Sequence, residues 1–430
     1  MPDVCVFGLG FVGLPLALSF AMRGCRVVGV DVDQALVAEL QAGVTHHLES
    51  YQGTPIQEIL RRELAAGRFR PTTDAAAAMA ACDNIIVTVG VPVEDGRHDL
   101  GPVLEVSRAI AAGLKPGDLV IVRSTLIPGT TRRDVLPVLE QSGLKAGRDF
   151  FLAYSSERIA EGRAFHEFEH MPAALAGLDQ ASAERAAALL SIVTKAEITL
   201  ASSFEVVEMA KVMENISRDV DIAMVNEFAR FARAMGVDIF EVVRVANTHL
   251  RVNLLTPGPG VGGYCLPNAL FYLLPRAREL GVELELLTTA RRVNDAVPSH
   301  VAGLALRNLP VPPAQARLAV LGIAMKDYSN DDRVSPALAA IRVLQEAGCQ
   351  VRAYDPAVPT PHPFKVGSLE EALSGAHGVL ILALQEGLPT RGLAAWRPLM
   401  AADGTPFIVD TRNAVDRAEC EAAGFRLETL

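Results

Sequence analysis

Short runs of apolar residues alternate with longer segments of helical periodicity along this chain, a pattern typical of parallel strands joined by helices. The first apolar run, over 4–7, precedes a glycine-rich turn and an apolar segment that can be helical as far as residue 23. Further strands are expected over 26–31, 84–89 and 118–122, with segments between them that can form helices. This order predicts an α/β fold with a parallel sheet at the amino-terminal end.

A different pattern begins near residue 201. The segment 204–235 has helical periodicity and contains neither glycine nor proline, which predicts one long helix at a domain centre or a subunit interface. Lys211 and Asn215 are four residues apart and therefore share one face of this helix, with Arg218 near the same stripe. The spacing fits a solvated face as well as a functional one.

The α/β pattern resumes after the proline-rich stretch 310–313, which we interpret as a linker. The expected elements are a helix over 335–347 and strands over 317–323, 350–355, 379–383 and 407–410. The first loop of this segment has Gly322 but no dinucleotide glycine pattern, so we expect a nucleotide-like ligand other than a second dinucleotide. The sequence thus predicts two Rossmann-like doubly wound domains joined by a long central helical region, with domains at 1–200, 201–309 and 310–430.

Gly8, Gly10 and Gly13 form a G-x-G-x-x-G pattern directly after the first strand. In a dinucleotide-binding turn the first glycine permits the tight turn, the second lets the backbone approach a pyrophosphate, and the third allows close packing of helix on strand. The phosphates then lie at the helix N-terminus, where free N–H groups favour anions. Asp31, at the end of the second strand, is placed to bind the ribose hydroxyls and to repel a 2′-phosphate, which favours NAD over NADP.

Composition limits the classes of function. The chain has 430 residues, 50% hydrophobic and 21% charged, which is ordinary for a globular protein of two or three domains. No apolar run approaches the ~20 residues that cross a bilayer, and the opening Met1-Pro2-Asp3 has no basic region, so we expect no membrane segment, no signal peptide and a cytoplasmic location. The net charge of −10, without a Lys/Arg cluster, disfavours nucleic-acid binding. The six cysteines lack metal-ligand or disulfide spacing, so we expect free thiols and no metal site.

Three irregular segments could carry chemistry. Four glycines and two prolines precede Cys265 in the segment 256–267, a composition that lets the backbone approach a ligand and then presents a thiol. Cys265 is therefore a candidate nucleophile, whereas the other five cysteines are expected to be buried apolar residues. Thr125 follows an apolar strand, at the edge where ligands of open α/β sheets bind. Glu157 also follows an apolar run and is interpreted as a general base or, equally, as a solvated carboxylate.

Together these segments resemble the nucleotide-sugar 6-dehydrogenase family, the NAD-dependent UDP-glucose and UDP-N-acetylhexosamine dehydrogenases. The resemblance covers essentially the whole chain, in family order. Its motifs stand here at Gly8–Pro15, Arg123–Thr131, Ser156–Arg158, Lys211–Asn215, Gly258–Cys265 and Lys326–Pro336. The stretch 247–253 is more similar to the acetamido-sugar branch, which includes the UDP-N-acetylmannosamine dehydrogenases, than to the UDP-glucose branch.

The resemblance implies that NAD removes hydride twice from C6 of the sugar, which passes from alcohol through aldehyde to carboxylate. Cys265 would attack the aldehyde, and Glu157 would activate the water that hydrolyses the resulting thioester, with Thr125 nearby. Lys211 and Asn215 would hold that water and stabilise oxyanions, which suits their shared helical face.

The resemblance also implies binding residues, a dimer or higher homo-oligomer, and a carboxyl-terminal domain that binds the UDP-sugar. Arg251, Lys326 and Arg333 would contact substrate or cofactor across domains or subunits and supply positive charge for a diphosphate. The expected NAD-binding residues are Gly8, Gly10, Phe11, Val12, Gly13, Asp31, Val89, Pro92, Ser124, Thr125 and Arg333. The expected substrate-binding residues are Glu157, Arg158, Lys211, Asn215, Arg251, Gly262 and Lys326.

Three positions depart from the family pattern. Ala269 stands where family members carry an aspartate four residues after the cysteine, Tyr264 replaces a His or Ser, and Ser156 replaces a Pro. Loss of one polar group from a catalytic cluster commonly costs ~10²- to 10³-fold in rate. Two alternatives therefore remain open: an enzyme that acts on an unusual nucleotide sugar or stops at the aldehyde, and an inactive paralogue that binds NAD and a nucleotide sugar. A simpler β-hydroxyacid dehydrogenase would not need the cysteine loop or a third domain.

Overall fold

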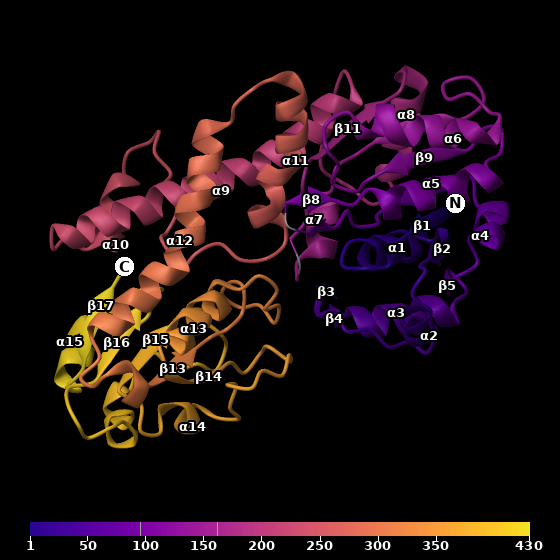
Figure 1. The fold of residues 1–430 in the computed structure, drawn as a ribbon. Coiled ribbons are helices and arrows are strands. Elements are labelled where there is room, and N and C mark those ends of the chain that lie inside the picture. The colour runs from indigo at the N-terminus through magenta and orange to yellow at the C-terminus, as the bar shows by residue number, and fades with distance from the viewer. Residues whose placement is uncertain (95, 161) are drawn as a thin grey trace. The chain divides into compact units, whose positions relative to one another are not determined.

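The computed structural model describes residues 1–94, 96–160 and 162–430, which form two compact units (Figure 1). The first unit comprises residues 1–214 and 271–282, and the second comprises residues 215–270 and 283–430. Each unit is built around one large sheet, so each is described by itself.

The first unit contains an eight-stranded sheet in the order β12-β11-β10-β9-β6-β1-β2-β5, in which every neighbouring pair is parallel except β10 with β11. Its strands are β1 (Asp3–Phe7), β2 (Arg26–Val30), β5 (Phe69–Thr72), β6 (Asn84–Val87), β9 (Leu119–Val122), β10 (Phe151–Tyr154), β11 (Ala173–Gly177) and β12 (Ile198–Leu200). Two short antiparallel pairs lie outside the sheet, β3 (Ser50–Tyr51) with β4 (Thr54–Pro55) and β7 (Val93–Glu94) with β8 (Arg97–His98).

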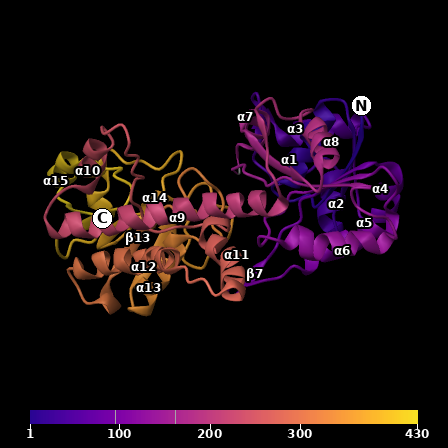
Figure 2. The same ribbon diagram turned by 90° about the horizontal axis from the view of Figure 1, so that it is seen from above.

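Helices cover both faces of this sheet (Figure 2). One group packs into the apolar core beneath β1 and contains α1 (Gly13–Met22), α3 (Ile56–Ala65), α7 (Ala164–His170) and α8 (Gln180–Leu190). The other group contains α4 (Ala75–Ala81), α5 (Gly101–Gly113), a π-helical turn (Thr131–Val135), α6 (Leu136–Leu139) and a short 3₁₀ turn (Glu140–Ser142). Asp33 caps the N-terminus of helix α2 (Gln34–Gln41), because its carboxylate accepts the N–H groups of Ala35 and Leu36.

The second unit contains a five-stranded parallel sheet in the order β14-β13-β15-β16-β17. Its strands are β13 (Arg317–Leu321), β14 (Gln350–Tyr354), β15 (Gly378–Ile381), β16 (Phe407–Asp410) and β17 (Arg426–Thr429). Apolar residues of α10 (Ile239–Ala246), α12 (Glu285–Arg307) and α13 (Pro336–Glu346) form the core on one face, and α14 (Leu369–Leu373) and α15 (Arg417–Ala422) belong to the core on the other. Three short 3₁₀ turns complete it, at Pro313–Gln315, Leu393–Ala395 and Arg397–Leu399.

Two helices contribute to both units. The long helix α9 (Phe204–Ala234) begins in the first unit and continues into the second, whereas α11 (Cys265–Leu280) begins in the second and continues into the first. The fold class predicted from the sequence, two Rossmann-like sheets joined by a central helical region, is confirmed. The predicted strands are also present, although those expected over 84–89, 317–323 and 379–383 already end at Val87, Leu321 and Ile381.

The two sheets begin with the same local arrangement. In the first, Leu9 N–H donates to the Asp31 carboxylate at 2.7 Å, directly after Gly8 at φ +90°. In the second, Ile323 N–H donates to the Asp355 carboxylate at 2.8 Å, directly after Gly322 at φ +80°. An aspartate at the end of the second strand thus holds the first loop of each sheet.

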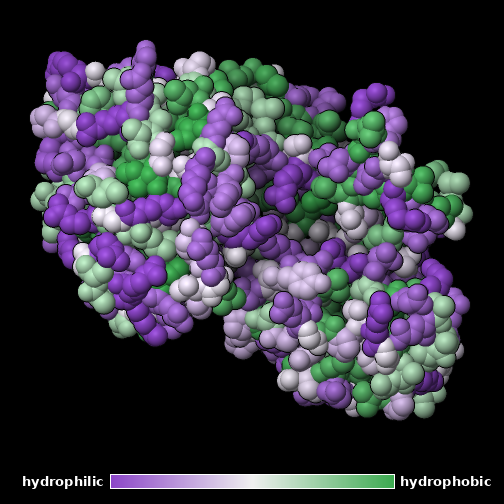
Figure 3. Space-filling model, turned by 180° about the vertical axis from the view of Figure 1, so that it is seen from behind, coloured by the Kyte–Doolittle hydropathy of each residue, from purple (hydrophilic) through white to green (hydrophobic). Residues whose placement is uncertain are grey.

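None of the described helices is both long and apolar enough to cross a membrane. On the face drawn in Figure 3, hydrophilic and hydrophobic residues are interspersed.

Gly322 provides a test of the close backbone approach in the second sheet. A Cβ at this position would lie 1.9 Å from the Ala383 carbonyl oxygen, whereas a Cβ at Gly424, at a similar φ of +79°, would meet nothing within 4 Å. Gly424→Ala should cost ~1–2 kcal/mol of unfolding free energy for left-handed backbone alone, and Gly322→Ala should cost about 4 kcal/mol or more because backbone must move. Urea unfolding followed by fluorescence of the single, buried Trp396 measures both, and equal losses would contradict the explanation.

Candidate active site

The glycine-rich loop after β1 fits a dinucleotide. A Cβ on Gly13 would lie 1.8 Å from the Gly8 carbonyl oxygen, so only glycine allows α1 to start this close to the strand end. A Cβ on Gly10 would meet no atom within 4 Å, so this side of the loop is open to a ligand. Phe11 and Val12 complete the loop before the N-terminus of α1, and both are half-buried.

A cavity of about 180 Å³ adjoins this loop and the end of β2. Asp31 borders it, and its carboxylate accepts the N–H groups of Leu9 at 2.7 Å and Asp33 at 3.0 Å. Two backbone donors fix the carboxylate and leave it acceptor capacity for ribose hydroxyls. The cavity is lined by Phe7, Gly8, Val30, Asp31, Val32, Thr73, Ala75, Val89, Pro102, Glu105, Val106 and Ala109. These residues fit the adenosine half of NAD, and two carboxylates without a basic side chain disfavour a 2′-phosphate.

The segment after β9 is held from three sides. Ser124 Oγ donates to the Val89 carbonyl at 2.6 Å, and Tyr154 Oη donates to the Ser124 carbonyl at 3.0 Å. The buried Glu208 carboxylate accepts the N–H groups of Gly129 at 2.6 Å and Thr131 at 2.9 Å. Thr125, half-buried, lies within this fixed segment.

Glu157 is buried, at 8% exposure, so its interpretation as a solvated carboxylate is wrong. Its Oε2 pairs with the Arg123 guanidinium, and its Oε1 accepts the N–H groups of Arg158 at 2.7 Å and Ile159 at 3.0 Å. Arg123 follows β9 and Glu157 follows β10, and these strands are parallel neighbours, so their carboxyl ends bring the two side chains together. Arg123 is itself 6% exposed, and its Nε has no hydrogen-bond partner among the described residues.

The guanidinium of Arg158 is bound to other groups of the protein. Its Nε donates to Glu214 at 3.0 Å, its Nη2 pairs with the same carboxylate, and its Nη1 donates to the Pro172 carbonyl at 3.1 Å. A role for Arg158 in substrate binding would therefore need either its backbone or a rearranged ion pair.

Helix α9 presents Glu208, Lys211 and Asn215 along one stripe, at spacings of three and four residues. Glu208 and Asn215 are buried and Lys211 is half-buried, which disfavours the interpretation of this face as a solvated one. Glu208, on the same stripe of α9, binds the segment that carries Thr125 through Gly129 and Thr131.

In the second unit, the glycine-rich loop before Cys265 packs without room for side chains. A Cβ on Gly262 would lie 2.7 Å from the Met325 carbonyl oxygen, and one on Gly263 would lie 2.5 Å from the Met325 sulfur. Gly263 N–H also donates to the Arg333 carbonyl at 3.2 Å. The loop is thereby fixed to the segment that follows β13.

Cys265 is exposed and is the first residue of α11. The unsatisfied N–H groups of a helix's first turn favour negative charge, which suits an oxyanion formed next to the sulfur. The other five cysteines are buried and free, as predicted. Ala269, one turn further along α11, is also buried, at 2% exposure.

A buried polar network between α9 and α12 supports the other end of the cysteine loop. Asp219 accepts from the Arg291 guanidinium at 2.6 Å and from the Asn294 amide at 2.9 Å. Asn226, next to Asn294, accepts the N–H of Gly258 at 3.0 Å. This network is not predictable from the sequence, because its members are dispersed along the chain and only the packing of α9 on α12 brings them together.

Three predicted binding cations lie in the second unit with different surroundings. Lys326 is exposed and has no ion-pair partner among the described residues, and Arg251 is also exposed. The Arg333 guanidinium lies 2.6 Å from Asp331, and this pair holds the pKa of the Asp331 carboxyl below its ordinary value against the opposing effect of burial. Lys326 and Arg333 both follow β13, at the carboxyl end of the sheet where ligands of such folds bind.

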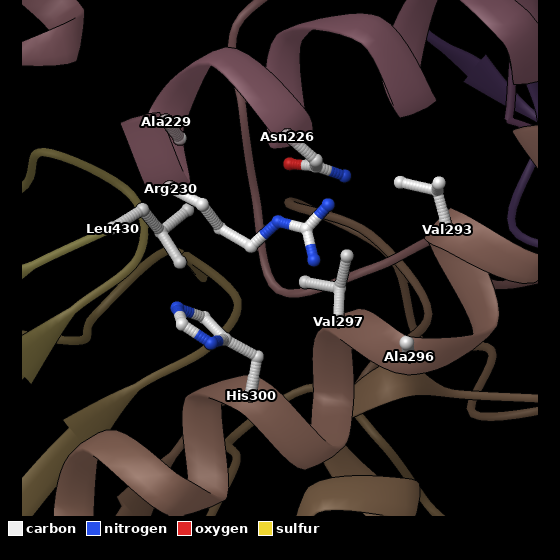
Figure 4. Close-up of a pocket in the computed structure, with 8 residues that line it drawn as sticks. All are labelled: Asn226, Ala229, Arg230, Val293, Ala296, Val297, His300 and Leu430. Carbon is white, nitrogen blue, oxygen red and sulfur yellow. The ribbon is translucent and has the colours of Figure 1, made fainter. Parts of the chain in front are cut away.

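A second, much smaller cavity lies between α9 and α12, bordered by Asn226 and Arg230 from one helix and Val297 and His300 from the other (Figure 4). Its volume of about 10 Å³ holds roughly one water molecule. Burial and then the neighbouring Arg307, Arg230 and Arg233 lower the pKa of His300. This cavity is too small for a nucleotide or a sugar.

The structure therefore distributes the predicted residues over both units. The first unit contains the glycine loop, Asp31, Val89, Pro92, Ser124, Thr125, Glu157, Arg158 and Lys211, and the second contains Asn215, Arg251, Gly262, Cys265, Lys326 and Arg333. Besides the polar network between α9 and α12, Arg123 and Glu208 are supporting residues whose roles the sequence alone did not indicate. A charged residue beside a buried strand end was the available signal for Arg123.

The Arg123–Glu157 pair can be tested by a double-mutant cycle. Arg123→Met leaves a buried carboxylate uncompensated and should cost ~3–5 kcal/mol of unfolding free energy. Adding Glu157→Gln should recover part of this loss, because no unpaired charge remains buried. Circular dichroism during urea unfolding measures the cycle. Lys145→Met, which breaks the exposed Lys145–Glu140 pair, is the control and should cost less than about 1 kcal/mol; additive losses at Arg123 and Glu157 would contradict the prediction.

Glu208 should make stability depend on pH. Burial raises the pKa of its carboxyl, although hydrogen bonds from Thr131 and Gly129 oppose this. Above the ordinary value of 4.5 the unfolded chain loses this proton more readily than the folded chain, so wild-type stability should fall relative to that of Glu208→Gln as the pH rises. Unfolding free energies of both proteins across this range test the sign, and parallel curves would show that Glu208 does not titrate differently on folding.

Comparison with known proteins gives matches over all parts of the chain. Models of the UDP-glucose/GDP-mannose dehydrogenase family match in its NAD binding domain over residues 2–194, its central domain over 205–296 and its UDP binding domain over 319–417.

Among curated relatives, a UDP-N-acetyl-D-mannosamine dehydrogenase of Pyrococcus horikoshii is 35% identical over 415 residues, covering 96% of each chain. A UDP-N-acetyl-D-glucosamine 6-dehydrogenase of Pseudomonas aeruginosa is 33% identical over 389 residues, covering 89% of this chain and 90% of the relative. The solved structure of the UDP-D-ManNAc dehydrogenase from Pyrococcus horikoshii superimposes with a TM-score of 0.91 at 34% identity, over 99% of this chain and 98% of that one. The chain therefore belongs to the UDP-glucose/GDP-mannose dehydrogenase family and is an NAD-dependent nucleotide-sugar 6-dehydrogenase.

Proposed function

We propose that this chain oxidises C6 of a UDP-N-acetylhexosamine, UDP-N-acetylmannosamine or UDP-N-acetylglucosamine, to the uronate. The relatives named above act on these sugars by their names, and the stretch 247–253 resembles the same branch. The observation that carries the proposal is Cys265, an exposed thiol at the first position of α11, after a loop fixed by close backbone contacts.

Two molecules of NAD, bound one after the other, would each accept one of the two hydrides that leave C6. The thiol of Cys265 adds to the aldehyde carbon after the first oxidation and keeps the carbon bound to the protein as a thiohemiacetal. Loss of the second hydride gives a thioester, whose carbon–sulfur bond is broken by water to release the carboxylate and return the thiol. Covalent attachment thus prevents the aldehyde from leaving between the two oxidations.

Glu157 is the proposed base for the attacking water. Its carboxylate accepts from Arg123 and from two backbone N–H groups, which leaves one acceptor site on Oε2 for a water. The ion pair with Arg123 fixes the direction in which that site points. Lys211 and Asn215, on one face of α9, are proposed to hold the water and the developing oxyanion, with Thr125 beside them.

The proposed ligand contacts follow the two sheets. NAD lies along Gly8, Gly10, Phe11, Val12 and Gly13, with Asp31 on a ribose. Val89, Pro92, Ser124, Thr125 and Arg333 complete its proposed contacts. Lys326 and Arg251 supply charge to the substrate diphosphate, together with the backbone at Gly262, and this is how a chain of net charge −10 binds an anion.

Ala269 favours a second candidate, an enzyme that stops at the aldehyde. The side chain at this position is a buried methyl group one turn after Cys265, so it provides no carboxylate there. If the missing aspartate assists thioester formation or hydrolysis, the reaction ends after one hydride.

We also propose a homodimer in the cytoplasm. Phe228 and Phe231, in the last two turns of α9, and Met235, directly after it, are 47%, 66% and 63% exposed, which is unfavourable for large apolar side chains in water. A second copy would cover them. NAD and nucleotide sugars are cytoplasmic metabolites, which supports the location. The division into domains at 1–200, 201–309 and 310–430 stays a prediction.

Product stoichiometry tests the proposed reaction. With UDP-N-acetylmannosamine or UDP-N-acetylglucosamine, the wild type should form two NADH per sugar and a uronate, identified by its mass. Cys265→Ala should lose uronate formation by at least ~10³-fold, because no thioester can form, whereas Cys349→Ala, at a buried thiol, should keep the stoichiometry. One NADH per sugar with a trapped aldehyde would establish the second candidate, and no NADH with any UDP-hexose would reject both.

A further inference from the structure

The cavity of the first unit is lined by polar side chains that lie outside the dinucleotide loop. Most of its walls are apolar, from residues such as Val32, Val106 and Ala109, and a flat base can lie between them. Only three of its lining residues carry polar side chains, namely Asp31, Thr73 and Glu105. Asp31 accepts two backbone N–H groups and faces the ribose position, so Thr73 and Glu105 remain for the edge of the base.

Glu105 lies on the face of helix α5 that lines the cavity. Pro102, Glu105, Val106 and Ala109 line the cavity at spacings of three, one and three residues, which places them on one face of the helix. The opposite face, with Val103, Ser107 and Ile110, is buried in the protein. The start of the helix is fixed as well, since Asp99 accepts the N–H of Gly101 at 2.8 Å.

The two remaining polar groups differ in what they can recognise. A threonine hydroxyl can donate or accept, so Thr73 does not distinguish an amino group from a carbonyl on the base. An ionised carboxylate can only accept. The 6-amino group of adenine is a donor, whereas the corresponding oxygen of hypoxanthine is an acceptor and would face the carboxylate unpaired.

We propose that Glu105 is a specificity-determining residue that accepts a hydrogen bond from the 6-amino group of the NAD adenine. Glu105 is exposed, so water solvates its carboxylate before NAD binds, and the folded chain carries no desolvation cost for this charge. The same carboxylate disfavours bases that present an acceptor at that position. Two acceptors that face each other are both left without a donor, and the free energy of removing them from water is not recovered.

The test compares binding of NAD and of nicotinamide hypoxanthine dinucleotide to the full chain by titration calorimetry, without any sugar. The wild type should bind NAD at least ~10-fold more tightly, the loss expected when a hydrogen bond to a charged group is replaced by an unpaired acceptor. Glu105→Ala should weaken binding of NAD and should not weaken binding of the hypoxanthine analogue, so that most of the preference for NAD is lost. Glu105→Gln should bring the two affinities within roughly threefold, because an amide can accept from one base and donate to the other.

Glu58→Gln is the matched control, since it makes the same charge change at an exposed position of α3 away from the cavity lining. It should keep the wild-type preference for NAD. Equal wild-type affinities for the two dinucleotides, or equal weakening of both by Glu105→Ala, would overturn the proposal. Since no sugar is present, either result leaves the proposed oxidation of C6 untouched, and a failure of that oxidation leaves this measurement valid.

Discussion

At two glycines of this protein the backbone lies so close to a carbonyl oxygen that no side chain would fit, and the candidate site depends on these two contacts. A Cβ would lie 1.8 Å from a carbonyl oxygen at Gly13 and 2.7 Å from one at Gly262. The first contact starts α1 next to the end of β1, and the second fixes the loop that ends at Cys265. Both the proposed cofactor loop and the proposed nucleophile, Cys265, are therefore positioned by main chain, which has little freedom to move.

In both sheets an aspartate after the second strand accepts backbone N–H groups of the first loop, but the two carboxylates differ in the acceptor capacity that remains for a ligand. Asp31 accepts two backbone N–H groups and borders a cavity of about 180 Å³. Asp355, in the equivalent position of the second sheet, is 2% exposed and accepts four backbone N–H groups and the Gln385 amide. A carboxylate whose acceptor sites are all occupied cannot bind ribose hydroxyls. The second sheet therefore has the strand and loop arrangement of a dinucleotide site but lacks a carboxylate that could bind the ribose. This agrees with the match of this region to a UDP binding domain.

Several charged side chains of the first unit pair with one another, and these pairs fix their positions. Arg123 and Glu157 neutralise each other in a buried pair, and Arg158 is held by Glu214. Such pairs add little net stability, because desolvation offsets most of the attraction, but they fix side-chain direction strongly. Arg123 therefore sets the direction of the Glu157 carboxylate, and with it the position of the proposed base.

The local sequence determined the elements whose signals lie close together. The glycine pattern with Asp31, the strand ends at Thr125 and Glu157, the unbroken helix over α9 and the thiol after a glycine-rich loop were all readable, because each rests on spacing within about 25 residues. The antiparallel placement of β11 was not, because strand direction beyond a crossover depends on pairing between distant segments.

The supporting contacts belong to the tertiary structure alone. Arg123 meets Glu157 only because β9 and β10 are neighbours, and Glu208 reaches Gly129 only because α9 returns to the end of β9. Glu105 borders the same cavity as Asp31 although 74 residues separate their positions in the chain. The sequence thus specified which groups could do the chemistry, whereas packing decided which of them are buried, paired or open to a ligand, since burial and pairing arise between residues that are distant along the chain.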